Sequence, residues 1–191
     1  MLYLFIGQQR NGKTISVVCE AKRLFELGYV VYSNIHLKFK YIPLTRKDIL
    51  DFEKKEIILP PKTLFIIDEM HGWFDSRNSA HSSNKLISYF MSQLGHFTSD
   101  KREGLIILGT SQKFSFIDIR GRYLVHKIIE CSKVSEKEDE YIKVLRVHKL
   151  NDNLNLKTVK KEVVIFDKED FNLYDTQQQM RGQYDDKPAI V

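Results

Sequence analysis

Eight residues near the amino terminus have the types and spacing of a phosphate-binding loop. Glycines at positions 7 and 12 allow the chain to wrap so that backbone N–H groups face a phosphate, and Lys13 and Thr14 follow directly. In such a loop the lysine bridges the β- and γ-phosphates of ATP, and the threonine hydroxyl is a ligand of Mg²⁺. The spacing therefore predicts a Walker A motif that binds ATP and Mg²⁺, made of Gly7, Gln8, Gln9, Arg10, Asn11, Gly12, Lys13 and Thr14.

Two adjacent carboxylates follow the apolar run at 64–67, in the manner of a Walker B motif. We expect Asp68 to hold Mg²⁺, usually through water, and Glu69 to polarise the attacking water as general base. A strand that ends in acids is common by itself, so this interpretation depends on the Walker A loop. Together the two motifs indicate an ATPase more than a simple nucleotide kinase.

Polar residues in two later segments suit the same chemistry. Gln112 follows a predicted strand, at the edge of the sheet where ligands bind, and would sense the γ-phosphate or orient water; a surface glutamine in a turn is the alternative. Arg120 and Arg122 lie in a predicted basic turn, and one of them, with Arg120 preferred, would reach a neighbour's ATP as a finger in trans. The alternative is that both are surface cations. The predicted catalytic residues are Lys13, Glu69, Gln112 and Arg120.

The elements that must position these residues alternate between strand and helix. Apolar residues at helical spacing predict a helix over 13–27, stopped by Gly28, and a second over 86–97. Residues 43–61 are expected to be irregular or partly helical. Short apolar and β-branched runs predict buried strands at 2–6, 29–35, 63–67 and 104–109. This alternation favours an α/β fold with a central, mostly parallel sheet flanked by helices.

The last third of the chain has a different pattern. Residues 123–130 read as a further strand, and a charged tip at 135–140 leads into 141–149, where apolar and polar residues alternate. This predicts an antiparallel β-hairpin added at the carboxyl end, with one more strand at 163–166. We expect one domain over 1–175 and a loose tail over 176–191.

Composition limits the class of protein. A length of 191 residues suits one α/β domain, and no apolar run approaches the 18 residues of a membrane span. The net charge of +5 is compatible with contact to nucleic acid but is more often a solvated surface. Cys19 and Cys131 have no metal-ligand spacing, which favours reduced core thiols and a cytoplasmic location, in a host cell or on a virion if the protein is viral.

The order of these motifs resembles the zonular occludens toxin-like (Zot-like) ATPases of the FtsK/HerA superfamily. The resemblance covers roughly residues 1–130 and includes the Ile-Ile-Asp-Glu Walker B segment, the glutamine of Gly-Thr-Ser-Gln at 109–112 and the run Phe-Ile-Asp-Ile-Arg at 116–120. It implies a RecA-like core, a homo-oligomeric ring, ATP turnover coupled to the movement of double-stranded DNA, Gln112 beside the γ-phosphate and an arginine near position 120 that crosses a subunit interface.

The resemblance leaves several functions open. Filamentous-phage members of the group usually carry a transmembrane helix and a further domain, which this sequence lacks, so we favour viral or mobile-element genome packaging with a possible capsid partner. The second hypothesis is a phage assembly or extrusion factor that acts with a membrane partner. A small-molecule P-loop kinase and a binding-only nucleotide module are the other two.

Overall fold

The structure is a computed structural model that describes residues 1–54, 58–73, 89, 92, 105–132, 135–137, 140–150 and 155–175. Its strands are β1 Leu2–Ile6, β2 Val30–Ser33, β3 Ile42–Pro43, β4 Thr63–Ile67, β5 Ile106–Ser111, β6 Lys127–Cys131, β7 Ser135–Lys137, β8 Glu140–Leu150 and β9 Leu156–Phe166. The α-helices are α1 Lys13–Glu26, α2 Arg46–Lys54 and α4 Ile119–Tyr123, and the 3₁₀ helices are η1 Met70–Gly72, η3 Phe114–Phe116 and η4 Asp170–Leu173.

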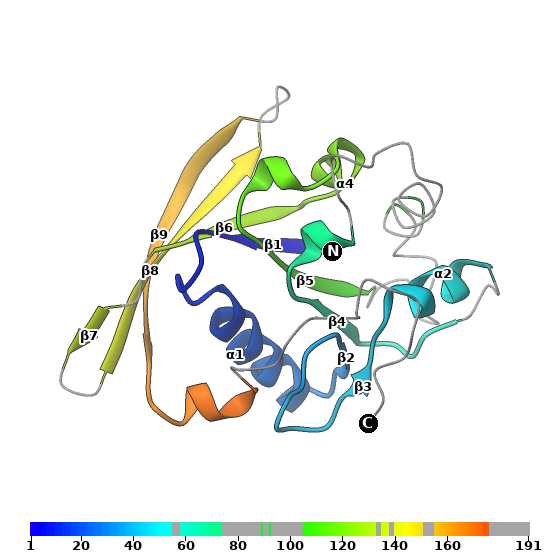
Figure 1. Ribbon diagram of the computed structural model, residues 1–191, viewed down its shortest axis with the longest axis horizontal. Helices are drawn as coiled ribbons and strands as arrows, with labels where there is room; N and C mark the ends of the chain where they lie inside the picture. The colour runs from blue at the N-terminus through cyan, green and yellow to red at the C-terminus, as the bar shows by residue number, and fades with distance from the viewer. Residues whose placement is uncertain are drawn as a thin grey trace.

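The described strands form a single nine-stranded sheet with the order β3-β2-β4-β5-β1-β6-β8-β7, and β9 pairs with β8 (Figure 1). Strands β1 to β6 are parallel, whereas β7, β8 and β9 are antiparallel to their neighbours. This confirms the predicted α/β fold with a mostly parallel sheet and an antiparallel addition at the carboxyl end. The placement of β5 between β1 and β4 matters most for the site, because it brings the end of β5 between the two predicted nucleotide motifs.

The central strands are buried on both faces, which explains their continuous apolar sequences. Along β1, Leu2, Leu4 and Ile6 point to one face of the sheet, and Phe5 points to the other. On the Phe5 face the sheet packs against α1 through Val17, Val18, Ala21 and Leu24. The apolar side of α1 is therefore pinned to the sheet directly after the predicted phosphate loop.

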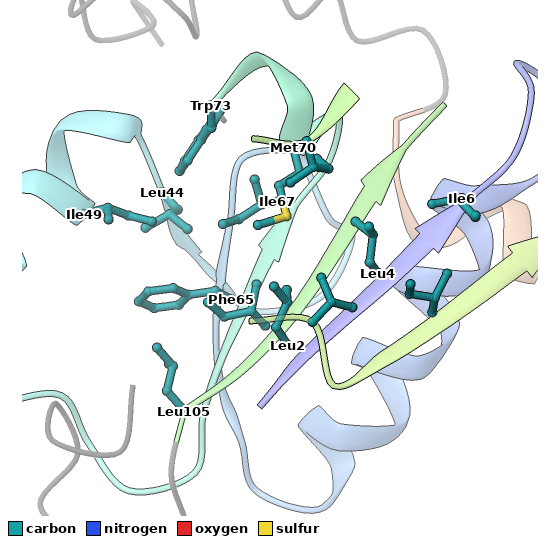
Figure 2. Packing of buried hydrophobic residues seen from close by; sticks show 14 of the residues in the cluster. Leu2, Leu4, Ile6, Leu44, Ile49, Phe65, Ile67, Met70, Trp73 and Leu105 are labelled. Carbon is teal, nitrogen blue, oxygen red and sulfur yellow. The ribbon is translucent and has the colours of Figure 1, made fainter. Parts of the chain in front are cut away.

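The opposite face is covered by α2, η1 and the segments around α4. Figure 2 shows Trp73 near Leu44 and Ile49, Met70 beside Ile67, and Phe65 lower in the view. Trp73 is fully buried and belongs to this core. Gly109 of β5 lies directly under η1, where a Cβ atom would stand 2.6 Å from the Sδ of Met70. The chain after β4 is thus packed tightly onto β5.

The antiparallel addition is larger than predicted. Strands β8 and β9 each run for 11 residues, so β9 includes the predicted strand at 163–166 and extends it toward the amino terminus. Together they form the long ribbon at one end of the sheet (Figure 1). The sequence pattern did not reveal residues 156–162 as a strand, because most of these residues are exposed and several are charged, so no apolar alternation marks their pairing with β8.

Several boundaries differ from the predictions. The predicted basic turn at 118–122 is wrong: Asp118 caps the short helix α4, its carboxylate accepting a hydrogen bond from the backbone N–H of Arg120. Tyr123 therefore ends a helix, and the following strand β6 begins at Lys127. Within the predicted helix 86–97 only Tyr89 and Ser92 are described, and both are helical. The predicted tail at 176–191 lies outside the described residues.

Within the part of the chain that the structure describes, no helix has the length and apolar character needed to cross a membrane.

Candidate nucleotide-binding site

The predicted Walker A residues form the loop between β1 and α1, anchored to the end of β6. A side chain at Gly7, where φ is +150°, would place its Cβ 2.7 Å from the carbonyl oxygen of Cys131. The amide of Asn11 donates a hydrogen bond of 3.0 Å to the same oxygen. The loop therefore needs glycine at position 7 because its backbone runs against the backbone of β6.

The amino end of α1 is suited to an anion. Gly12 precedes the helix in the left-handed conformation, no side chain caps the helix, and its first turn contains no acidic residue. The first backbone N–H groups thus remain available, and the helix dipole adds partial positive charge at the same place. Lys13 is buried and its ammonium donates to the carbonyl oxygen of Gln8, 3.1 Å away, across the loop.

The two predicted motifs meet at the hydroxyl of Thr14. This hydroxyl donates a hydrogen bond of 3.0 Å to Oδ1 of Asp68, although the two residues are 54 positions apart. The hydroxyl of Thr110, near the end of β5, donates to the same oxygen at 2.7 Å. The register of the parallel sheet causes this meeting, because Ile67 of β4 pairs with Gly109 of β5 and the next residues are Asp68 and Thr110.

The backbone of Asp68 is fixed by a third strand end. The Asn34 amide, just after β2, donates to the carbonyl oxygen of Asp68 at 2.9 Å and accepts from its N–H at 2.8 Å. The N–H and the carbonyl oxygen of Asp68 therefore both have hydrogen-bond partners just beyond the end of β4, where the backbone pairing between strands stops. The carboxylate is left to face the phosphate loop.

Glu69 has an uncommon backbone conformation for a residue with a side chain. Its φ is +51°, in the left-handed region, and its N–H donates to the hydroxyl of Thr110 at 2.9 Å. Its Oε2 lies 3.1 Å from Nδ1 of His71, yet both atoms are buried without a hydrogen bond. Because no hydrogen bond from the described residues satisfies this buried carboxylate oxygen, a water molecule or a substrate group can still bind to it.

The donor set around Asp68 fits a divalent cation. Burial raises the pKa of this carboxyl above its usual value, and the charge of Glu69 adds to the increase, while the hydroxyls of Thr110 and Thr14 and the charge of Lys13 oppose it. A cation would offset the cost of burying this negative charge. The chemistry of Thr14 and Asp68, a hydroxyl and a carboxylate that already touch, matches the oxygen ligands that Mg²⁺ requires.

The remaining predicted residues are not all assembled with this cluster. Gln112 directly follows β5 and is half-buried, next to the strand end that carries Thr110. Arg120 is held by Asp118, with its Nε 3.0 Å from Oδ1 and its Nη2 3.2 Å from Oδ2. Arg122 donates to the backbone carbonyl of Ile117 at 2.8 Å. Both guanidinium groups thus have partners within the chain.

Three site residues were missed by the sequence interpretation: Asn34, Thr110 and Lys143. Thr110 and Asn34 lie in segments that had been singled out, but only strand register shows that they contact Asp68. Lys143, on β8, donates to the carbonyl oxygen of Gly12. A signal for it was present, because Lys143 occupies an apolar position in the alternating pattern of this strand.

Comparison with known proteins gives a family and a fold. The sequence profile described as "Zonular occludens toxin (Zot)" matches residues 1–181, well beyond the expected 1–130. The crystal structure of the N-terminal domain of zonular occludens toxin from Neisseria meningitidis is similar, with a TM-score of 0.59, 18% identity, and coverage of 91% of this chain and 98% of that chain. The genome packaging NTPase B204 from Sulfolobus turreted icosahedral virus 2, in complex with ATP-gammaS, gives a TM-score of 0.48, 14% identity, and coverage of 83% and 96%.

A comparison with curated proteins finds no match. At 18% identity the structural similarity to the Neisseria domain bears on the fold alone, whereas the profile covers almost the whole chain. The chain therefore belongs to the zonular occludens toxin (Zot) family of P-loop NTPases.

Proposed function

We propose that the protein is a Mg²⁺-dependent ATPase that couples hydrolysis to the translocation of double-stranded DNA. The observation that carries the ATPase part is the contact of Thr14 and Thr110 with one carboxylate oxygen of Asp68, beside the uncapped amino end of α1. This arrangement brings an anion site and a cation site into contact, as MgATP requires.

Each residue then has a separate task. The loop from Gly7 to Thr14 binds the phosphates, and Lys13 leaves the Gln8 carbonyl to bridge the β- and γ-phosphates. Thr14 and Asp68 would hold Mg²⁺, which neutralises phosphate charge when bound. Glu69 accepts the proton of the attacking water, and Gln112 orients this water or senses the γ-phosphate.

An arginine from a neighbouring subunit completes the site in this proposal. Arg120 or Arg122 stabilises the charge that develops on the transferred phosphoryl group, which requires a homo-oligomeric ring. Arg120 must first leave both oxygens of Asp118, so oligomer assembly has to supply a competing partner. If Arg120 rather than Arg122 is this arginine, release of the Arg120–Asp118 pair is a condition for activity.

The DNA part of the proposal rests on the resemblance to the FtsK/HerA superfamily and on charge. The net charge of +5 and pI near 9.0 favour contact with phosphate backbones. Genome packaging for a virus or mobile element, with a capsid partner, is the form of translocation that we favour. The second candidate, which follows from the same family resemblance, is phage assembly or extrusion with a membrane partner.

Steady-state hydrolysis of ATP with Mg²⁺ tests the proposal, with and without double-stranded DNA, at about 50 and about 200 mM salt. We expect equal amounts of ADP and free phosphate, stimulation by DNA, and a steep loss of stimulation at higher salt because phosphate contacts release counterions. Turnover that DNA does not change would contradict translocation and favour a partner-coupled assembly ATPase. Transfer of phosphate to an added acceptor would identify a kinase instead.

Two variants provide controls. Lys13→Ala should weaken nucleotide binding and abolish turnover, whereas Glu69→Gln should keep ATP bound and stop hydrolysis, because only activation of water is lost. Normal turnover by Glu69→Gln would refute the general-base role. Tight ATP binding by the wild-type protein with negligible turnover, even with DNA, would indicate a binding-only module.

A further inference from the structure

A second lysine lies at the phosphate loop, supplied by the antiparallel part of the sheet. Lys143 is on β8, two residues from Leu145, which pairs with Cys131 at the end of β6. Leu145 and Cys131 belong to the core on the α1 side of the sheet, and the Lys143 side chain, only 1% exposed, continues this face toward the loop. The β8–β9 ribbon thus places the ammonium group of Lys143 beside an otherwise apolar part of the core.

The ammonium of Lys143 binds the start of α1 through two neutral acceptors. Its Nζ donates to the carbonyl oxygen of Gly12 and to Oγ of Ser16, each at 2.5 Å. The Ser16 hydroxyl itself donates to the Gly12 carbonyl at 3.0 Å. These contacts fix Gly12, the residue directly before Lys13, so Lys143 stabilises the end of the phosphate loop where α1 begins.

Lys143 has no carboxylate within ion-pair distance among the described residues. Besides its two acceptors it faces the ring of Phe166, whose centroid is 5.8 Å from Nζ. Burial lowers the pKa of Lys143, and the nearby charge of Lys13 lowers it further, while the Cys131 and Cys19 thiols oppose these effects. A buried cation beside a second cation is costly unless an anion joins them.

We propose that Lys143 is a second cation of the phosphate-binding site, a positioning residue whose missing counter-charge is the polyphosphate of the bound nucleotide. The inference rests on the proposed nucleotide binding and extends it, because it makes the β8–β9 ribbon a part of the site. Lys143 acts through the Gly12 peptide and through its charge, whereas Lys13 contacts the phosphates themselves. Nucleotide binding therefore stabilises the attachment of the ribbon to α1.

Lys143→Met tests this with a matched control, Lys149→Met, which removes the same charge from an exposed position on the same strand. Calorimetric titration with AMP, ADP and a non-hydrolysable ATP analogue gives the affinities. For Lys143→Met we expect a loss that grows with the charge of the nucleotide and reaches about 10- to 30-fold for the triphosphate. Lys149→Met should bind like the wild-type protein, and Lys143→Arg should recover part of the affinity.

The midpoint of thermal unfolding without nucleotide distinguishes an electrostatic role of Lys143 from a purely structural one. We expect Lys143→Met to unfold at the same temperature as the wild-type protein or higher, since it removes a buried charge without a counter-ion. The nucleotide-induced increase in the midpoint should shrink. Lys143→Gln, which keeps hydrogen-bond donors but no charge, should show the same graded loss of affinity.

Other outcomes would overturn the inference. An equal loss for AMP, ADP and the triphosphate analogue, or full affinity in Lys143→Gln, would mean that the side chain is a structural tether. Failure of both uncharged variants to fold without nucleotide would contradict the need for an external anion. If the wild-type protein itself binds none of the nucleotides, the proposed function fails instead, and this result is distinct from normal binding by Lys143→Met.

Discussion

Replacement of Thr110 by valine removes one hydroxyl that forms hydrogen bonds with both predicted Walker B residues, Asp68 and Glu69. Thr110 is fully buried, and its hydroxyl donates to Oδ1 of Asp68 at 2.7 Å while accepting the N–H of Glu69 at 2.9 Å. Valine keeps the shape of the side chain and its fit to the strand, so the change isolates the two hydrogen bonds. The Glu69 N–H would be left without its partner in a residue whose φ is +51°.

The cost follows from these two bonds. A hydrogen bond to an ionised carboxylate contributes about 1.5–3 kcal/mol, and a buried N–H without a partner costs about 1–3 kcal/mol. Because Asp68 keeps the donor of Thr14 and can relax, we expect the free energy of unfolding to fall by about 2–4 kcal/mol. If Glu69 is the general base, as proposed, ATP hydrolysis should fall more than nucleotide binding, since displacement of a catalytic group by about 1 Å lowers turnover by roughly 100-fold.

Urea unfolding and steady-state ATP hydrolysis measure the two effects on the same preparations. Thr110→Ser keeps the hydroxyl and is the matched control, which should retain most of the turnover. Nucleotide affinity of Thr110→Val should change far less than turnover, because the Walker A loop is untouched. Turnover within about twofold of wild type, together with unchanged stability, would refute the role of this hydroxyl in holding Glu69.

Three further predictions address charge and assembly. The pKa of Asp68 is raised in the folded protein, so without Mg²⁺ or nucleotide the free energy of unfolding should fall as pH rises from about 4 through that folded pKa. Asp68→Asn should remove this dependence of the unfolding free energy on pH, measured by urea unfolding, and an unchanged dependence would contradict the prediction. Mixing Arg120→Ala with Glu69→Gln protein should restore some hydrolysis if Arg120 acts across a subunit interface, and no rescue at any ratio would exclude it. Burial and Asp170 raise the pKa of Cys19 to about 12, so its alkylation at about pH 8, followed by mass spectrometry, should be slow and should accelerate in Asp170→Asn; equal rates would argue against this cause.

Local sequence pattern was sufficient for the elements around the phosphate loop. The apolar run before Gly7 and the helical spacing after Lys13 predicted β1 and α1 closely, because a buried parallel strand and an amphipathic helix each have a distinctive periodicity. The same patterns failed for α4, a helix of five residues, and for most of β9. A very short helix is decided by its cap, and an exposed strand by the partner with which it pairs.

The sequence alone determined which residues the candidate site contains: the loop with Lys13 and Thr14, and the carboxylates of Asp68 and Glu69 after a strand. These identities follow from spacing within short segments, where backbone geometry depends on neighbouring residues. Only the tertiary structure decided that Thr110 bridges the two carboxylate residues and that Lys143 stands behind the loop. Strand order and register create these contacts between distant segments, and no local periodicity encodes which strand ends become neighbours.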